Sequence, residues 1–188
     1  MTENRILDLE FMREIYKLQY IKRYNTWQRI NNESVAEHSF FVVLFTHKVC
    51  KMLNLPDKFL LKAMEISMIH DLPEIVINDI THDAKCVMPE IVPILDKYET
   101  KYLSEHYSDI MNEDDFTSDD MELLNNIFKM ADCLSAIQYS DNEVQLGNKR
   151  FELILKEASD RYFIHEEIVK NLMKLRRAIS SEAVLSKT

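Results

Sequence analysis

Apolar residues recur along most of the chain at the three- and four-residue spacing of amphipathic α-helices. With the capping residues and prolines, this pattern predicts helices over residues 7–24, 34–53, 57–70, 89–111, 118–147 and, as one or two helices, 150–180. Residues 75–81 are expected to form a short helical turn or a loop, and residues 112–120 a polar connection. The pattern therefore predicts an all-α protein of about six helices, with no convincing strand.

Local signals define several of these helix ends. Ser34 and Glu37 have the spacing of a capping box, in which each side chain satisfies the other residue's backbone amide, so a helix should begin at Ser34. Gly147 can adopt the left-handed conformation that ends many helices. Pro73 lacks an amide donor and should disturb the helix directly after His70.

Composition narrows the class of protein. The 188 residues, 46% of them hydrophobic, suit one helical domain over residues 1–180 followed by a frayed tail at 181–188. There are 23 basic and 32 acidic residues, a formal net charge of −9, which argues against nucleic acid as a partner. The single glycine, Gly147, excludes a Walker loop and a dinucleotide fingerprint, each of which needs several glycines.

The chain also carries compartment signals. Its three cysteines are far apart, which is typical of a reducing compartment rather than of a disulfide framework. The first residues lack the pattern of a signal peptide, and the most apolar run, residues 40–45, is too short to span a bilayer. We therefore expect a cytoplasmic protein with no membrane segment.

Four polar residues stand out because they lie in apolar helical surroundings, where a charge or an imidazole is costly: His38, the adjacent pair His70 and Asp71, and Asp132. A single buried histidine is most often a hydrogen-bonded core residue, but such positions on three predicted helices indicate a common partner. Two imidazoles and two carboxylates suit one divalent transition metal ion (Mn, Co, Fe, Ni or Zn) better than Mg or Ca.

Glu74 follows His70 by four residues, so it faces the same side if the helical turn survives Pro73. A carboxylate beside a metal site that is not itself a ligand is suited to activating water. Asp79 follows five residues later. Without the metal set, the ordinary interpretations are a solvated carboxylate for Glu74 and a helix cap for Asp79.

The order of these motifs resembles the HD-domain metal-dependent phosphohydrolases, in particular the YfbR-like 5′-deoxynucleotidase branch with its HD-domain-containing-protein-2 relatives. The likeness covers residues 18–151. It rests on four segments: Ser34-Val-Ala-Glu37-His38-Ser39, His70-Asp71-Leu72-Pro73-Glu74, Asp79, and Lys129-Met130-Ala131-Asp132.

The resemblance implies a helical HD-domain bundle, usually a homodimer, acting on a small nucleotide. It implies that one metal ion is held by four residues: His38, His70, Asp71 and Asp132. Glu74 would orient and deprotonate the attacking water, and Asp79 would assist proton transfer to the leaving oxygen. Arg23 occupies the position of an arginine on the phosphate side of the substrate. Tyr24 stands where the family has a tryptophan that crowds the sugar 2′ position, and the only tryptophan here is Trp27.

The favoured function is metal-dependent hydrolysis of nucleoside 5′-monophosphates, with 2′-deoxy substrates expected, to nucleoside and phosphate. One alternative is a dNTP triphosphohydrolase of the same family, because the same metal centre serves both reactions. A second is a non-catalytic helical module with a structural metal. The small number of cations near the motifs favours a monophosphate, and the closed metal shell of a structural site would leave Glu74 without a role.

Overall fold

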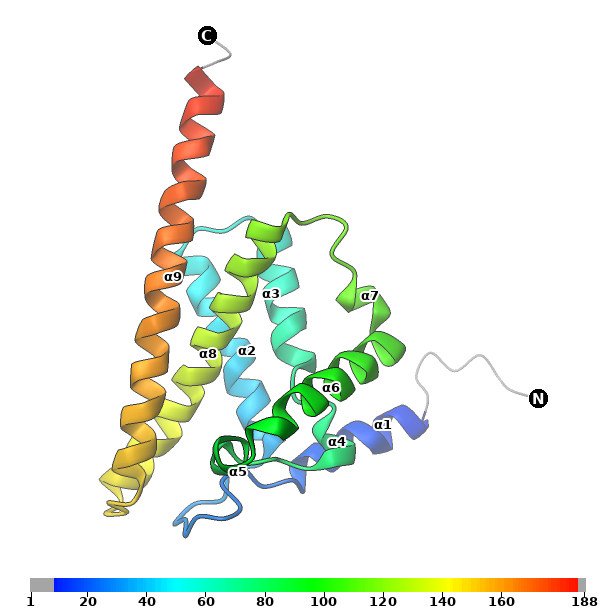
Figure 1. Cartoon of the computed structure of the whole chain (residues 1–188), viewed down its shortest axis with the longest axis vertical. Coiled ribbons are helices and arrows are strands. Elements are labelled where there is room, and N and C mark those ends of the chain that lie inside the picture. The colour runs from blue at the N-terminus through cyan, green and yellow to red at the C-terminus, as the bar shows by residue number, and fades with distance from the viewer. Residues whose placement is uncertain (1–8, 186–188) are drawn as a thin grey trace, which may run out of the picture.

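The computed structural model describes residues 9–185, which form helices joined by turns and loops, without a β-strand in that range. In chain order the elements are α1 (Leu9–Ile15), the 3₁₀ helix η1 (Tyr16–Gln19), α2 (Val35–Met52), α3 (Asp57–Ile69), α4 (Glu74–Ile77), α5 (His82–Val87), the 3₁₀ helix η2 (Pro89–Ile91), α6 (Val92–His106), α7 (Ser108–Met111), α8 (Ser118–Gln145) and α9 (Phe151–Leu185) (Figure 1). The all-α prediction is confirmed. No helix in the described range is both long enough and apolar enough to cross a membrane.

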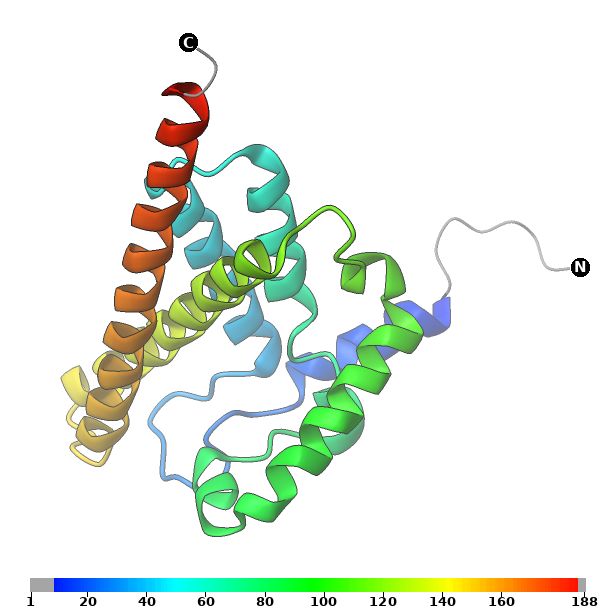
Figure 2. The same ribbon diagram turned by 45° about the horizontal axis from the view of Figure 1, so that its top comes forward.

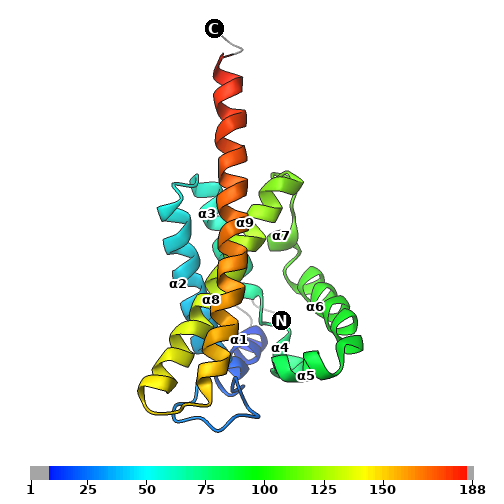
Figure 3. The same ribbon diagram turned by 60° about the vertical axis from the view of Figure 1, so that its left-hand side comes forward.

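Four long helices form the body of the molecule. Helices α8 and α9 make the most extensive pairing, and α2 and α3 pack on each other and on α8 (Figure 1). Helices α6 and α7 lie on the opposite side of the bundle from α2 (Figure 3), with α5 at the start of α6, α1 toward its other end and α4 between them (Figure 1). The C-terminal end of α9 extends beyond the other helices (Figure 1).

Two apolar clusters stabilise this arrangement. The larger one joins α2, α3, α8 and α9 around fully buried side chains that include Phe59, Leu124 and Ile127. Burial of each such side chain away from water stabilises the folded state by about 1.5–3 kcal/mol. The smaller cluster, centred on Val35 and Ile69, joins the start of α2 and the end of α3 to η1, α6 and α7. The metal-binding candidates lie on the elements that these two clusters hold together.

The predicted helix ends at Ser34 and Gly147 are confirmed. Ser34 and Glu37 form the capping box, with a bond of 2.7 Å from the Ser34 amide to Glu37 Oε2. Gly147 has φ +97°, its amide donates to the Val144 carbonyl, and the Asn148 amide donates to the Glu143 carbonyl. These two bonds are a Schellman motif, which ends α8 and turns the chain into α9.

The first helix is shorter than the prediction of residues 7–24. Residues 7 and 8 lie outside the described range; α1 ends at Ile15, and η1 follows. The chain then extends to pair with the segment before α2: Ile21 accepts from the Val35 amide at 3.0 Å, and Arg23 donates to Glu33 at 3.1 Å through their backbones. Tertiary pairing therefore overrides the helical pattern beyond residue 19.

Three other boundaries differ from the predictions. The segment 89–111 is divided into η2, α6 and α7, and the break between the last two falls at Tyr107, whose φ of −138° and ψ of 40° are not helical. Helix α5 was not expected; its N-cap is Thr81, whose hydroxyl accepts from Ala84. Helix α9 runs to Leu185 instead of ending near residue 180, so only residues 186–188 of the expected frayed tail lie outside the described range.

Candidate metal centre

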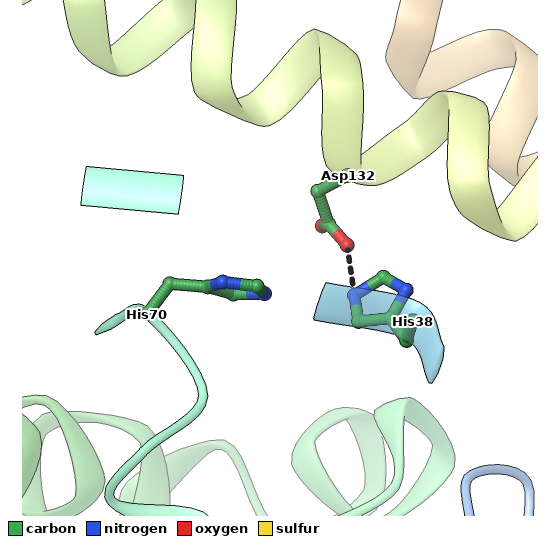
Figure 4. A group of neighbouring side chains, drawn as sticks. All are labelled: His38, His70 and Asp132. Carbon is green, nitrogen blue, oxygen red and sulfur yellow. Dashed lines mark ion pairs between the residues drawn. The ribbon is translucent and has the colours of Figure 1, made fainter. Parts of the chain in front are cut away.

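Three elements bring together two imidazoles and a carboxylate. His38 lies one turn into α2, His70 follows the last residue of α3, and Asp132 lies in the middle of α8. One ligand atom from each lies within 4.8 Å of the other two. Figure 4 shows the Asp132 carboxylate pointing at the His38 ring, with 3.1 Å between Oδ1 and Nε2, and the His70 ring directed toward the same point. Residues separated by almost a hundred positions therefore meet at one place.

Asp71 completes the four-residue set that the sequence indicated. Its Oδ2 lies 3.0 Å from His70 Nε2 and 3.6 Å from His38 Nε2. The turn after α3 makes this possible, because Asp71 follows His70 directly and the chain keeps a helical curl through Pro73, whose φ and ψ are −57° and −24°. The carboxylates of Asp71 and Asp132 therefore both approach the Nε2 edges of the two histidines.

Hydrogen bonds orient both imidazole rings. The Nδ1 of His70 lies 2.7 Å from the Ser67 carbonyl, which can only accept a proton, so Nδ1 carries a hydrogen and Nε2 is the nitrogen that faces Asp71. The Nδ1 of His38 lies 2.9 Å from Ser135 Oγ, and Arg23 approaches the same nitrogen. A bond donated by the far nitrogen, as from His70 to Ser67, is how proteins direct a histidine at a metal, whereas Arg23 can only donate to His38.

The charges at this site are strongly coupled. Burial and the neighbouring Arg23 lower the pKa of His38 to about 4. Burial alone would lower the pKa of His70, but Asp71 raises it to about 9. Burial alone would raise the pKa of Asp132, but its hydrogen bond and charge interaction with His38 hold that pKa well below its ordinary value. The anionic carboxylates therefore favour a positive charge between them.

The donor set fits a divalent transition metal ion. His70 Nε2 is buried and makes no hydrogen bond, although Asp71 Oδ2 lies close to it, and Glu74 Oε2 is likewise buried without a hydrogen-bond partner. Buried polar atoms without partners are rare, and a cation satisfies such donor atoms. Two imidazole nitrogens and two carboxylates are ligands that suit Mn, Fe, Co, Ni or Zn.

Glu74 and Asp79 lie beside this group. Glu74 is the first residue of α4, and the helical curl through Pro73 keeps it on the side of His70. Burial and the charges of Asp71 and Asp79 raise the pKa of Glu74 to about 9. Burial also raises the pKa of Asp79. A carboxylate with a raised pKa in a cavity is a group placed to exchange protons.

The candidate metal-binding residues line a cavity of about 220 Å³, which we call the loop-side cavity. Its walls come from residues 23–27, α4, α5, α8 and α9. The sequence-predicted residues that line it are Arg23, Tyr24, His38, His70, Asp71, Glu74, Asp79 and Asp132. The structure therefore brings the whole predicted set to one cavity.

Arg23 and Tyr24 occupy the inner wall. Arg23 Nη1 lies 3.1 Å from Glu33 Oε2 and also contacts His38, so its charge sits directly behind a candidate ligand. Tyr24 has φ 53°, and its ring stacks on Tyr139 with centroids 5.0 Å apart and planes 4° apart. This ring belongs to an aromatic wall of the cavity and does not project freely into it.

Sequence reasoning missed the wall that α9 supplies. Ile154, Glu157 and Arg161 line the loop-side cavity, at a spacing that places them on one face of the helix. Their spacing was the only sequence signal, and it is shared by every amphipathic helix. A second cavity of about 380 Å³ adjoins the site on the side of α6 and shares His70, Asp71, Glu74 and Asp132 with the first.

Comparison with known proteins now identifies the class. The family model described as 5′-deoxynucleotidase YfbR-like matches residues 10–171, so the chain belongs to the YfbR-like family. No curated protein matches the sequence. With the ligand cluster, the family defines a metal-dependent phosphohydrolase that acts on phosphate esters.

Solved structures share the fold. A conserved hypothetical protein from Pyrococcus furiosus is 25% identical, with a TM-score of 0.64, and the match covers 89% of this chain and 99% of that one. An HD-domain phosphohydrolase from Listeria innocua is 20% identical, with a TM-score of 0.63 and coverage of 88% and 83%. An HD phosphohydrolase from cyanophage S-2L, bound to dA and one catalytic Zn²⁺ ion, is 17% identical, with a TM-score of 0.61 and coverage of 98% and 99%.

Proposed function

We propose that this protein hydrolyses nucleoside 5′-monophosphates, preferentially 2′-deoxy, to nucleoside and phosphate. The observation that carries the proposal is a cluster of two imidazoles and two carboxylates at one cavity, with the buried carboxylate of Glu74 beside it and without a hydrogen-bond partner. Membership of the YfbR-like 5′-deoxynucleotidase family supports the reaction type. The dA-bound Zn²⁺ phosphohydrolase of cyanophage S-2L, which shares the fold, is consistent with a nucleoside-sized ligand.

Four residues would hold the ion: His38, His70, Asp71 and Asp132. When bound, a divalent ion supplies a water of lowered pKa and neutralises phosphate oxygens. Glu74 would orient that water and accept its proton at a carboxylate oxygen. Asp79 would deliver a proton to the 5′-oxygen that leaves with the nucleoside. Arg23 would add positive charge on the phosphate side, because its guanidinium lies behind His38.

The space at the metal centre fits a nucleotide-sized substrate. The loop-side cavity of about 220 Å³ and the adjoining cavity of about 380 Å³ share the metal-site residues, so together they fall within the roughly 300–1,000 Å³ of typical small-molecule sites. Tyr24, which lines the cavity and stacks on Tyr139, supports discrimination at the sugar, because a packed ring leaves little space for an added hydroxyl. We therefore assign to Tyr24 the role of limiting the sugar that fits.

A specific observation keeps the triphosphohydrolase alternative in view. Arg161 lines the loop-side cavity together with Arg23 and Lys85, so α9 adds a cation that the motifs did not indicate. The additional phosphates of a triphosphate would contact these cations. Incubation with dAMP and dATP, followed by identification of phosphate or triphosphate as product, separates the two reactions.

The deciding experiment is a panel of deoxy- and ribonucleoside monophosphates, assayed after chelation and after addition of Mn²⁺, Co²⁺ or Zn²⁺. We expect no phosphate release after chelation, restored release with metal, and faster release from deoxy substrates. The Asp132→Asn variant is expected to lose metal and activity together. A protein that retains a tightly bound ion but releases phosphate from no substrate would instead be the helical module with a structural metal.

Assembly as a homodimer and a cytoplasmic location belong to the same proposal. Three large apolar side chains on α2 support a protein interface, since Phe40, Phe41 and Leu44 are 60%, 43% and 48% exposed. Light scattering after size-exclusion chromatography measures the oligomeric state directly. The spacing of the cysteines supports the reducing compartment, and localisation of a tagged chain tests it.

A further inference from the structure

Glu143, near the end of α8, is a fully buried carboxylate, with an exposed fraction of 0%. It takes no part in the metal centre and does not line either cavity beside it. Buried carboxylates are rare unless they are paired or fully hydrogen-bonded. The hydrogen-bond partners of the Glu143 carboxylate therefore indicate its role.

Within the described residues, the hydrogen bonds that the Glu143 carboxylate accepts come from outside α8. Its Oε1 accepts from the Asn31 amide at 2.7 Å, and its Oε2 accepts from the Ile30 amide at 2.8 Å and from Asn148 Nδ2 at 2.8 Å. Asn148 Nδ2 also lies 2.9 Å from the Gln28 carbonyl. One carboxylate thus fastens a segment more than a hundred residues away in the chain to the corner between α8 and α9.

That segment, residues 24–31, is here called the pocket loop. It has no helix or strand of its own, and Figure 2 shows it running between the α8–α9 corner and α5. At its other side, Trp27 Nε1 donates to Asp83 Oδ2 at 3.0 Å and Asn25 Nδ2 donates to the Asp79 carbonyl at 3.2 Å. The pocket loop therefore spans the loop-side cavity from α8 and α9 to α5.

The pocket loop also carries aromatic rings to the cavity. Tyr24 stacks on Tyr139, and the Trp27 ring lies 6.0 Å from the Phe151 ring. Tyr139 reinforces the attachment, because its hydroxyl donates to the Asn31 carbonyl at 2.6 Å. A loop without internal secondary structure keeps such rings in place only if its ends are held, and the α8 end is held mainly by Glu143.

We propose that Glu143 is a positioning residue that holds the pocket loop, and with it Tyr24 and Trp27, against the loop-side cavity. It acts through the loop and does not touch the reacting atoms. The inference about loop position stands on the contacts alone; its effect on substrate affinity rests on the proposed function.

Trp27 is the only tryptophan in the chain, so its fluorescence reports on the pocket loop without any substrate. The test variant is Glu143→Gln, which keeps the shape but places an NH₂ group against a backbone N–H donor. The matched control is Glu122→Gln, which changes an exposed glutamate on the same helix. All measurements use the full-length protein loaded with Mn²⁺.

For Glu143→Gln we expect a red shift of Trp27 emission and acrylamide quenching about 1.5-fold stronger or more, since a released loop exposes its side chains to solvent. Glu122→Gln should match the wild type. With the nucleotide that the wild type hydrolyses best, KM should rise about tenfold with kcat within about twofold, as expected when binding contacts are lost but the chemical step is intact. A purely structural role would lower stability without separating KM from kcat.

A folded Glu143→Gln protein with the emission and quenching of the wild type would overturn the proposal. If that variant does not fold, Glu143→Asp decides, because it keeps the charge but draws the carboxylate away from the Ile30 and Asn31 amides: stronger quenching supports the proposal, and unchanged quenching overturns it. Altered fluorescence with no hydrolysis by the wild type on any nucleotide would leave the positioning role intact and reject the proposed function instead.

Discussion

The carboxylate of Glu74 occupies the position on which the proposed reaction depends most directly. It borders both cavities, and one of its oxygens is buried without a hydrogen-bond partner. The pKa of this carboxyl is raised by burial and by Asp71 and Asp79, and a cation nearby would lower it again. Its readiness to take a proton is therefore coupled to the occupation of the metal centre.

We predict that Glu74→Gln keeps the metal and lowers kcat by about a hundredfold or more, the usual contribution of a general base. Glutamine retains the shape but cannot accept the proton of the attacking water. Metal content by mass spectrometry and steady-state rates with a mononucleotide test both parts. The control, Glu65→Gln on α3, changes a glutamate that lines neither of these cavities. A metal-loaded Glu74→Gln protein of wild-type activity would remove Glu74 from the mechanism.

Arg161 gives a second prediction for a single residue. It is an exposed cation on the α9 wall of the loop-side cavity, with no hydrogen bond or ion pair recorded among the described residues. Arg161→Gln is expected to raise KM about threefold to tenfold with little change in kcat, because a charged contact to substrate is lost at a partly solvated site. Arg150→Gln, an exposed arginine outside the cavity, is the control. If Arg150→Gln raises KM as much as Arg161→Gln does, the change comes from the net charge of the protein and not from a contact between Arg161 and the substrate.

At this scale the sequence was informative wherever a polar residue interrupts an apolar helix. His38 and Asp132 were recognisable because their helical neighbours are apolar; His38 is buried, whereas the Asp132 side chain is 36% exposed. Arg161 and Glu143 gave no such signal, since each stands in a helix with many charged residues. Their roles depend on which distant segment lies opposite, and a single helical pattern does not contain that information.

At the scale of elements, the corner between α8 and α9 carries two functions. It ends α8 through Gly147, and it holds the pocket loop through Glu143 and Asn148. The same few residues therefore join the long helical hairpin to the wall of the cavity. Disturbing the corner should affect both stability and substrate binding.

Gly147→Ala tests the helix end. With φ +97° the position favours glycine, although an added Cβ would meet no atom within 4 Å, so the penalty is conformational and not steric crowding. We expect a loss of about 1–2 kcal/mol in the free energy of unfolding, measured by urea denaturation. Gln145→Ala, at the last position of α8, should be close to neutral. An equally stable Gly147→Ala protein would mean that the corner relaxes to another conformation.

Glu143 predicts how stability depends on pH. Burial alone would raise its pKa, but hydrogen bonds from Ile30, Asn31 and Asn148 lower the pKa below its ordinary value. A lowered folded-state pKa means that the ionised group stabilises the protein above the unfolded pKa of about 4.3, and that this contribution is lost as pH falls through the folded value. Glu143→Gln should cost about 1–3 kcal/mol at pH 7, since a buried N–H loses its acceptor.

The measurement is urea unfolding of wild type and Glu143→Gln between pH 7 and pH 3. The difference between their free energies of unfolding should be constant near neutral pH and shrink below about pH 4.3. Glu122→Gln, whose side chain is exposed, should show no such convergence. A difference that stays constant to pH 3 would contradict the ionised state assigned to Glu143.

Helix boundaries show what could be predicted at this scale. The start of α2 and the end of α8 were predictable because a capping box and a left-handed glycine are local chemistry. The end of the first helix was not, because Ile21 and Arg23 leave the helical pattern to pair with Val35 and Glu33. Such pairing depends on segments that only the folded chain brings together.

At the scale of the whole molecule, the metal centre lies where three mutually packed parts of the bundle meet. Its candidate ligands come from α2, from the turn after α3 and from α8, and two of them, Asp71 and Asp132, are carboxylates. The bundle holds these groups in place, and a bound cation would offset their repulsion. Stability of the entire fold should therefore depend on the metal.

We predict that chelation lowers the midpoint of thermal unfolding and that Mn²⁺, Co²⁺ or Zn²⁺ restores it. An ion that binds only the folded state at a hundred times its dissociation constant stabilises that state by about 2.7 kcal/mol, which corresponds to roughly 5–11 °C in a protein of this size. His38→Ala removes one ligand, so its unfolding midpoint should not respond to metal. The matched control is His47→Ala on α2, outside the ligand cluster, and it should respond as the wild type does. A metal response that survives His38→Ala would place the ion elsewhere in the molecule.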